Sequence, residues 1–224
     1  MKDTVIFDLD GTIADTLEDL ADAVNQGLKQ LGFPEHPVEK YKLMVGNGAQ
    51  KLCIRALPED KKELADTLYD LFKSYYDIHY LDKTSAYKGI DKVIRDLIDD
   101  DFTVAVATNK PQDVARKVFA SLLPDLAGEV RVLGGCAERA KKPDPAIIYE
   151  ILGGAPDKEC RIFMVGDSNV DIRTAKSAGI ISVGCLWGFR SRQELENEGA
   201  DFIAEAPEDV EDIINMVVYG GFLG

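Results

Sequence analysis

The sequence predicts an α/β fold, namely a doubly wound parallel sheet of the Rossmann-like type with an inserted helical cap domain. Apolar runs of strand length recur along the chain, and after Asp101 they alternate with helical patterns. Such alternation is typical of a parallel sheet that is covered by helices on both faces. A long segment after the first run carries helical patterns only, which indicates an insertion.

The elements of the sheet domain follow from these runs and from the helical spacing of apolar residues between them. We expect strands at Thr4–Leu9, Phe102–Thr108, Val130–Leu133, Ile162–Val165, Ile180–Gly184 and Phe202–Ala204. We expect helices at Gln112–Leu122, Pro145–Leu152, Val170–Ala178, Arg192–Glu198 and Glu208–Val218. Folds of this kind bind ligands beyond the carboxyl ends of the strands.

The inserted segment, from about residue 14 to residue 87, reads as helices only. We expect them at Leu17–Leu31, Val38–Leu57 and Lys61–Tyr80, separated by breaks that contain glycine or proline. The prediction is therefore an α/β core of residues 1–13 and 88–224 and a helical cap of residues 14–87. Gly46-Asn47-Gly48 is either the tip of the cap that faces the site or an ordinary turn between helices.

Composition excludes some partners. The chain has 224 residues, 46% of them hydrophobic, and a net charge of −14, which is enough apolar material for a substantial core. The acidic balance argues against non-specific binding of nucleic acid and against docking on anionic membranes. A small anionic substrate stays compatible with it, because charge at a site can oppose the overall field.

Nothing in the sequence indicates export or membrane insertion. The chain passes from Met1-Lys2-Asp3 directly into the first expected strand, so we expect no signal peptide. No apolar run approaches membrane-spanning length, and no two of the four cysteines are spaced as a metal knuckle or redox pair. We expect a soluble cytoplasmic protein with reduced thiols; its oligomeric state cannot be read from the sequence.

The most informative motif is an apolar run that ends in acid, Val5-Ile6-Phe7-Asp8-Leu9-Asp10-Gly11-Thr12. A carboxylate is costly at the edge of a core unless it is paired or binds a metal. Residues two apart in a strand point the same way, so Asp8 and Asp10 are expected to converge on one site. Gly11 permits a sharp turn, and Thr12 adds a hydroxyl. The pattern indicates phosphoryl chemistry.

Two further clusters can bind an anion. Thr108-Asn109-Lys110-Pro111 offers a hydroxyl and backbone N–H groups at a strand end, although Thr108 could instead cap the helix that follows. Lys141-Lys142-Pro143-Asp144-Pro145 places a lysine before a helix, where it can reach a phosphate; a solvated basic turn is the alternative.

A fourth cluster, Val165-Gly166-Asp167-Ser168-Asn169-Val170-Asp171, again follows a buried strand directly. Oxygen ligands from Asp8, Asp10 and Asp167 would suit Mg²⁺. The alternative is that Asp167 or Ser168 only caps the next helix.

The four clusters, in this order, resemble the haloacid dehalogenase superfamily of aspartate-nucleophile phosphohydrolases. The resemblance covers nearly the whole chain, and the insertion falls where members with a helical cap carry theirs. Within the superfamily the chain is most similar to phosphoglycolate phosphatases. The segments that carry this likeness are Val45-Gly46-Asn47-Gly48-Ala49, Thr108-Asn109-Lys110-Pro111, and Trp187-Gly188-Phe189 followed by Ala200-Asp201.

The resemblance implies a role for each matching residue. Asp8 would be the nucleophile and Asp10 the general acid and base. Mg²⁺ would be held by Asp8, the backbone carbonyl of Asp10, and Asp167. The phosphoryl oxygens would be bound by Thr108 and Lys142, together with Asn109, and Asp171 would orient Lys142 or a metal-bound water. Lys141 is the competing choice for the lysine.

The expected function is therefore Mg²⁺-dependent hydrolysis of a small organic phosphate monoester, with 2-phosphoglycolate first among substrates. Dehalogenases lack the second aspartate, whereas Asp10 is present here, and Thr12 favours hydrolysis over a sugar-phosphate mutase. Pyrophosphatase or nucleotidase activity, a phosphomutase, and a catalytically silent binding protein stay open as alternatives.

Overall fold

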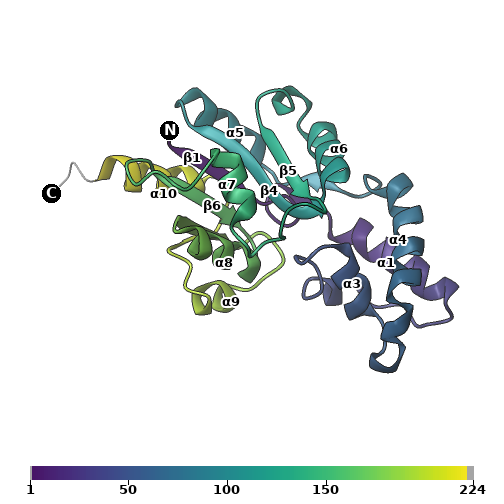
Figure 1. Cartoon of the computed structure of the whole chain (residues 1–224). Helices are drawn as coiled ribbons and strands as arrows, with labels where there is room; N and C mark the ends of the chain where they lie inside the picture. The colour runs from purple at the N-terminus through teal and green to yellow at the C-terminus, as the bar shows by residue number, and fades with distance from the viewer. Residues whose placement is uncertain (1, 221–224) are drawn as a thin grey trace.

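The computed structural model describes residues 2–220, and within them it has the expected α/β architecture (Figure 1). Six parallel strands of this part of the chain form one sheet in the order β5-β4-β1-β6-β7-β8. They are β1 (Thr4–Phe7), β4 (Thr103–Pro111), β5 (Arg131–Gly135), β6 (Ile162–Gly166), β7 (Ile181–Cys185) and β8 (Phe202–Ala204). The predicted fold class is confirmed, and every expected strand is present with small differences at its ends.

Helices cover both faces of the sheet. One face packs on α5 (Ile90–Asp99), α6 (Gln112–Leu122) and α10 (Asp209–Tyr219), with a 3-10 turn at Pro124–Leu126 beside α6. The other face packs on α7 (Ala146–Leu152) and α8 (Asn169–Ala178), with α9 (Arg192–Asn197) beside α8. Strand β1 shows why both faces need cover, because its side chains alternate between them. Val5 and Phe7 point into the apolar cluster under α5, α6 and α10, and Ile6 points into the cluster under α7 and α8. Helix α5 was not predicted, although its apolar residues follow helical spacing.

The order of the strands positions the site. After β1 the chain adds β4 and β5 on one side of it, and then adds β6, β7 and β8 on the other. Strand β1 is therefore flanked by β4 and β6, and the carboxyl ends of all three meet at one edge of the sheet. Such a reversal in strand order is where open α/β sheets bind ligands.

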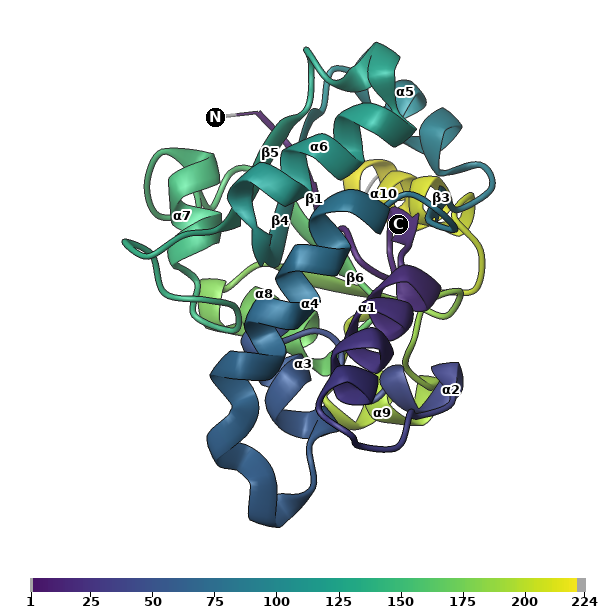
Figure 2. The same cartoon turned by 90° about the vertical axis from the view of Figure 1, so that its right-hand side faces the viewer.

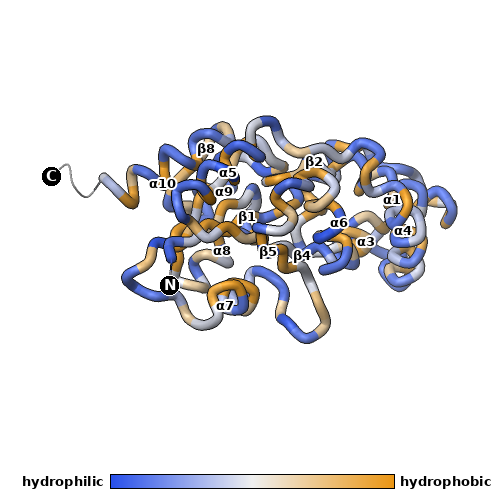
Figure 3. The backbone as a smooth tube through the Cα atoms, turned by 90° about the horizontal axis from the view of Figure 1, so that it is seen from above, coloured by the Kyte–Doolittle hydropathy of each residue, from blue (hydrophilic) through white to orange (hydrophobic). Residues whose placement is uncertain are grey.

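The inserted helices pack on one another at that edge. They are α1 (Leu17–Gln30), α2 (Val38–Tyr41), α3 (Ala49–Ala56), a 3-10 segment (Glu59–Leu64) and α4 (Ala65–His79). Helices α1 and α4 lie side by side (Figure 2), and their apolar faces form a cluster separate from the two around the sheet. Hydrophobic and hydrophilic residues alternate along these helices (Figure 3), as expected for amphipathic helices that share a small core.

Two expectations for the insertion are wrong. The segment is not purely helical, because β2 (Ala14–Asp15) and β3 (Ser85–Ala86) pair antiparallel where the chain leaves and re-enters the core. The expected helix Val38–Leu57 is broken into α2 and α3, because Gly46 and Gly48 between them have φ values of +114° and +84°. The domain limits at residues 14 and 87 stay a prediction, and residues 221–224 of the core range lie outside the described part of the chain.

Among residues 2–220, no helix combines the length and the apolar character that spanning a membrane requires.

Candidate active site

The carboxyl ends of β1, β4 and β6 bring the polar clusters of the sequence together. Asp8 follows β1, Asp167 follows β6, and Thr108 lies near the end of β4. The pairing of β4 with β5 shifts register between Ala107 and Pro111. This irregularity interrupts the ladder where Thr108 lies, as bulges beside active sites commonly do.

Asp8 is buried and is held through one carboxylate oxygen. Its Oδ1 accepts a hydrogen bond from the backbone N–H of Leu9 at 2.7 Å and lies 2.9 Å from Nζ of Lys142. Burial and then the charge of Asp171 raise the pKa of Asp8 to about 7, although the ammonium of Lys142 opposes that rise. The two donors fix the orientation of the carboxylate.

Lys142, rather than Lys141, reaches the site. Its buried Nζ donates to Oδ1 of Asp171 at 2.7 Å and to the carbonyl oxygen of Ala107 at 2.7 Å, besides its contact with Asp8. Burial alone would lower the pKa of Lys142, but the charges of Asp171 and Asp8 and the hydrogen bonds to both raise it to about 12. Lys141 is exposed. A charged ammonium is thus fixed between two carboxylates.

Three buried carboxylates lie close enough to hold one metal ion. Asp8, Asp167 and Asp171 each offer an oxygen, and these oxygens lie within 4.8 Å of one another. Burial, followed by the charges of Asp171 and Asp8, raises the pKa of Asp167 well above its usual value. Among residues 2–220, the ammonium of Lys142 forms ion pairs with two members of this group, and Arg190 acts on Asp167 through its charge without a hydrogen bond. Three carboxylates thus surround one paired ammonium, so negative charge is concentrated here. Hard oxygen donors with excess negative charge fit a Mg²⁺ ion.

Asp167 is available for such a role because other groups cap helix α8. Oδ2 of Asp171 accepts hydrogen bonds from the backbone N–H of Ser168 at 3.1 Å and from its hydroxyl at 2.7 Å, in a capping box. Oδ2 of Asp167 instead accepts from the backbone N–H of Phe189 at 2.7 Å. The capping alternative therefore applies to Ser168 and not to Asp167.

Two glycines let the backbone close around Asp167. A Cβ atom at Gly11 would lie 2.4 Å from Oδ2 of Asp167, and one at Gly188 would lie 2.3 Å from its Cβ. Gly11 also has a φ of +84°, which favours glycine. Any larger residue at either position would displace the carboxylate.

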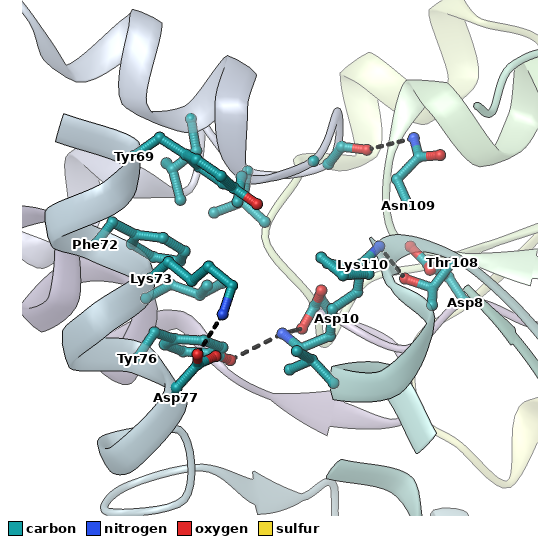
Figure 4. A pocket seen from close by; sticks show the side chains of 18 residues that line it. Asp8, Asp10, Tyr69, Phe72, Lys73, Tyr76, Asp77, Thr108, Asn109 and Lys110 are labelled. Carbon is teal, nitrogen blue, oxygen red and sulfur yellow. Dashed lines mark hydrogen bonds and ion pairs between the residues drawn. The ribbon is translucent and has the colours of Figure 1, made fainter. Parts of the chain in front are cut away.

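Asp10 joins the core to the cap through a lysine. Its Oδ1 accepts hydrogen bonds from the hydroxyl of Thr16 at 2.7 Å and from Nζ of Lys110 at 2.8 Å. Lys110 also donates to the hydroxyl of Tyr76 on α4 at 2.8 Å (Figure 4). Burial alone would lower the pKa of Lys110, but Asp10 and Tyr76 raise it above its usual value. Asp8 and Asp10 line the same pocket, yet the carboxylate of Asp10 lies outside the three-carboxylate group.

Thr108 and Asn109 have different surroundings. The hydroxyl of Thr108 accepts from the backbone N–H of Lys110 at 3.2 Å and does not cap α6. The amide nitrogen of Asn109 donates to the carbonyl oxygens of Gly46 at 3.0 Å and Lys142 at 3.1 Å, while its Oδ1 accepts from the backbone N–H of Lys142 at 2.9 Å. The side chain of Asn109 thus ties the loop between α2 and α3 (residues 42–48, here termed the cap loop) to the core. Because both polar atoms of this side chain are engaged, Asn109 would have to bind phosphate through its backbone N–H, which stays a prediction.

A pocket between core and cap exposes this chemistry to a substrate (Figure 4). Its core wall carries the polar residues, and its cap wall is largely apolar and aromatic. The core side includes Asp8, Asp10, Thr108, Asn109 and Lys110, and the cap side includes Leu20, Val45, Leu52, Tyr69, Phe72 and Tyr76.

Sequence reasoning missed part of the site. Lys110 lay within a recognised cluster but received no role, although a lysine at an expected strand end, where such folds bind ligands, was a usable signal. Tyr76 gave no signal, because its spacing is that of an ordinary core residue. Thr12, which was expected to add a hydroxyl beside the aspartate pair, is buried, and its hydroxyl lies 3.7 Å from Sγ of Cys185.

Comparison with known proteins agrees with the expected resemblance. Residues 5–185 match the family described as haloacid dehalogenase-like hydrolase. Phosphoglycolate phosphatases of Vibrio parahaemolyticus and Mannheimia succiniciproducens are 30% and 33% identical, each over 94% of this chain and over 95% and 96% of their own lengths. The crystal structure of a predicted phosphoglycolate phosphatase from Haemophilus somnus 129pt superposes with a TM-score of 0.83 at 28% identity, over 95% of this chain and 98% of that one.

Proposed function

Because the chain belongs to the haloacid dehalogenase-like hydrolase family, we propose that it is a Mg²⁺-dependent phosphatase that acts through an aspartyl-phosphate at Asp8. Its substrates are small organic phosphate monoesters, with 2-phosphoglycolate the first candidate, since relatives of similar length carry that name. The observation that carries the proposal is the orientation of Asp8, which lines the pocket, is held by Lys142 and Leu9, and lies beside two further carboxylates.

In the first half of the reaction, a carboxylate oxygen of Asp8 attacks phosphorus. The oxygen–phosphorus bond to Asp8 forms while the bond from phosphorus to the leaving oxygen breaks. Asp10, which lines the same pocket, supplies the proton that the leaving alcohol takes up. Thr108 and Lys142 bind the phosphoryl oxygens, on which the charge of the transition state lies.

In the second half, Asp10 accepts a proton from the water that attacks the aspartyl-phosphate. The bond between phosphorus and Asp8 then breaks, inorganic phosphate forms, and the carboxylate of Asp8 is restored. Lys110 holds Asp10 at 2.8 Å and contacts the cap through Tyr76, so closure of the cap supports the position of the base. A closed cap also excludes bulk water until the phosphoenzyme has formed.

The residues that would hold Mg²⁺ are Asp8, Asp167 and the backbone carbonyl of Asp10. A bound Mg²⁺ offsets the repulsion between the nucleophilic carboxylate and the phosphate. Asp171 does not need to bind the ion, because both of its oxygens accept hydrogen bonds, from Lys142 and Ser168. Its role is to position Lys142.

Phosphate release from a panel of esters, with Mg²⁺ and with a chelator, tests the proposal. The panel contains 2-phosphoglycolate, pyrophosphate, nucleoside monophosphates and sugar phosphates. We expect Mg²⁺-dependent release with preference for 2-phosphoglycolate and loss of turnover in Asp8→Asn. Preference for pyrophosphate or a nucleotide would change the assigned substrate but leave the proposed mechanism in place. Full turnover by Asp8→Asn would exclude Asp8 as the nucleophile, and transfer to a second sugar hydroxyl would indicate a mutase.

A further inference from the structure

Three aromatic side chains of helix α4 form the pocket wall that faces the catalytic residues. Tyr69, Phe72 and Tyr76, here termed the aromatic strip, all line the pocket and point toward the side that carries Asp8 (Figure 4). Their rings stack in sequence, with centroids 6.3 Å apart for Tyr69 and Phe72 and 5.2 Å apart for Phe72 and Tyr76. The strip therefore presents a continuous apolar surface rather than three separate contacts.

Apolar side chains from other elements extend this surface. They are Leu20 of α1, Val45 of the cap loop, Leu52 of α3 and Val114 of α6. The wall is thus assembled from both core and cap. A substrate group that covers this surface would remove apolar side chains of both core and cap from water.

The charges on the wall are already paired. Lys73 forms an ion pair with Asp77 one helical turn further along α4, and Lys110 is bound to Asp10. A substrate carboxylate, such as that of 2-phosphoglycolate, would gain a cation by replacing Asp77 beside the exposed Lys73, which costs little because such exposed ion pairs are weak. An apolar group needs no such exchange.

We propose that the aromatic strip binds the leaving group of the substrate, and that the substrate class of this enzyme includes arylalkyl phosphate monoesters. The inference rests on the proposed phosphatase function. The phosphate lies against Asp8 and Thr108, and the carbon portion of the ester extends from the leaving oxygen across the rings of Tyr69 and Phe72. Tyr76, hydrogen-bonded to Lys110, marks the boundary between the polar and the apolar halves of the pocket.

The test compares kcat/KM for benzyl phosphate and ethyl phosphate, with 2-phosphoglycolate as a third substrate. Both leaving groups are primary alcohols, so the added ring changes apolar contact much more than leaving-group chemistry. We expect benzyl phosphate to be favoured about tenfold or more, which is the effect of burying most of one phenyl ring. The ratio is measured on one preparation, so the fraction of active protein cancels.

Variants of the aromatic strip test whether it causes the preference for benzyl phosphate over ethyl phosphate. Tyr69→Leu and Phe72→Leu keep an apolar side chain but remove a ring. Each is expected to lower the benzyl-to-ethyl ratio at least about threefold, mainly through KM for benzyl phosphate. Tyr75→Leu is the matched control, because Tyr75 lies on the same helix, stacks on His79 and does not line the pocket. It should leave the ratio unchanged.

Two kinds of failure are distinguishable. If 2-phosphoglycolate is hydrolysed but benzyl and ethyl phosphate are used equally well, the leaving-group proposal is wrong and the phosphatase function stands. An unchanged ratio in both Tyr69→Leu and Phe72→Leu overturns the proposal in the same way. If no ester releases phosphate with Mg²⁺ present, the proposed function itself fails.

Discussion

Replacing Lys142 with methionine tests how much the buried ammonium of the site contributes to the free energy of unfolding. Methionine keeps much of the apolar stem but removes the ammonium, which contacts Asp8 at 2.9 Å and Asp171 at 2.7 Å. Lys142 and both carboxylates are buried, so solvent cannot replace the lost cation. Removing one partner of a buried ion pair costs about 3–5 kcal/mol of unfolding free energy, because the other charge is left uncompensated. For a chain of this size that lowers Tm by roughly 6–20 °C.

The assay is urea unfolding of the metal-free protein, followed by circular dichroism. Lys141→Met is the matched control, because Lys141 is the exposed neighbour, and it should change the free energy of unfolding by no more than about 0.5 kcal/mol. In an Asp8→Asn background, Lys142→Met should cost less, since one of the two carboxylates no longer carries charge. Equal stability of the Lys142→Met and Lys141→Met proteins would refute the assignment of Lys142 as the counter-ion.

Three further predictions concern metal binding and the cap. Folding raises the pKa of Asp8 from 3.8 to about 7, so the folded state holds its proton more tightly. The stability of the metal-free protein should therefore fall as pH rises from about 4 to 7, with a shallower fall in Asp8→Asn, as denaturant titrations would reveal. Gly188→Ala would place a Cβ 2.3 Å from the Cβ of Asp167 and should raise the Mg²⁺ concentration for half-maximal activity about tenfold. Gly128→Ala is the control, because its Cβ would meet nothing within 4 Å, and it should leave this concentration unchanged. Equal effects of the two substitutions would contradict the packing argument. Asn109→Ala removes the 3.0 Å hydrogen bond to the cap loop and should raise KM and the rate of proteolysis within that loop, whereas wild-type protection would show that the bond does not restrain the cap.

The sequence alone predicted every strand of the sheet and the helices that cover it, except α5. Buried strands of a parallel sheet must be apolar on both faces, so runs such as Thr4–Leu9 and Ile162–Val165 were readable without any contact information. The carboxylates that directly follow such runs were also readable from the sequence. Asp8 and Asp167 could be singled out because a charge at the edge of an apolar core needs a partner.

Local sequence patterns were less informative where glycines or very short strands determine the course of the backbone. The strands Ala14–Asp15 and Ser85–Ala86 are too short to show any periodicity, and they exist because each pairs with the other across the insertion. The break of the expected helix Val38–Leu57 depended on two glycines with positive φ, which the helical spacing around them concealed.

Only the tertiary structure decided which polar residues meet. Strand order places β4 and β6 on either side of β1, which brings Asp167 beside Asp8. The segment between β5 and α7 then brings Lys142 to Asp8, where the side chain of Asn109 holds its backbone, and leaves Lys141 exposed. The link from Asp10 through Lys110 to Tyr76 joins residues far apart in the chain. The residue types that the chemistry requires are thus written in local sequence, whereas their pairing depends on long-range packing, which no local pattern encodes.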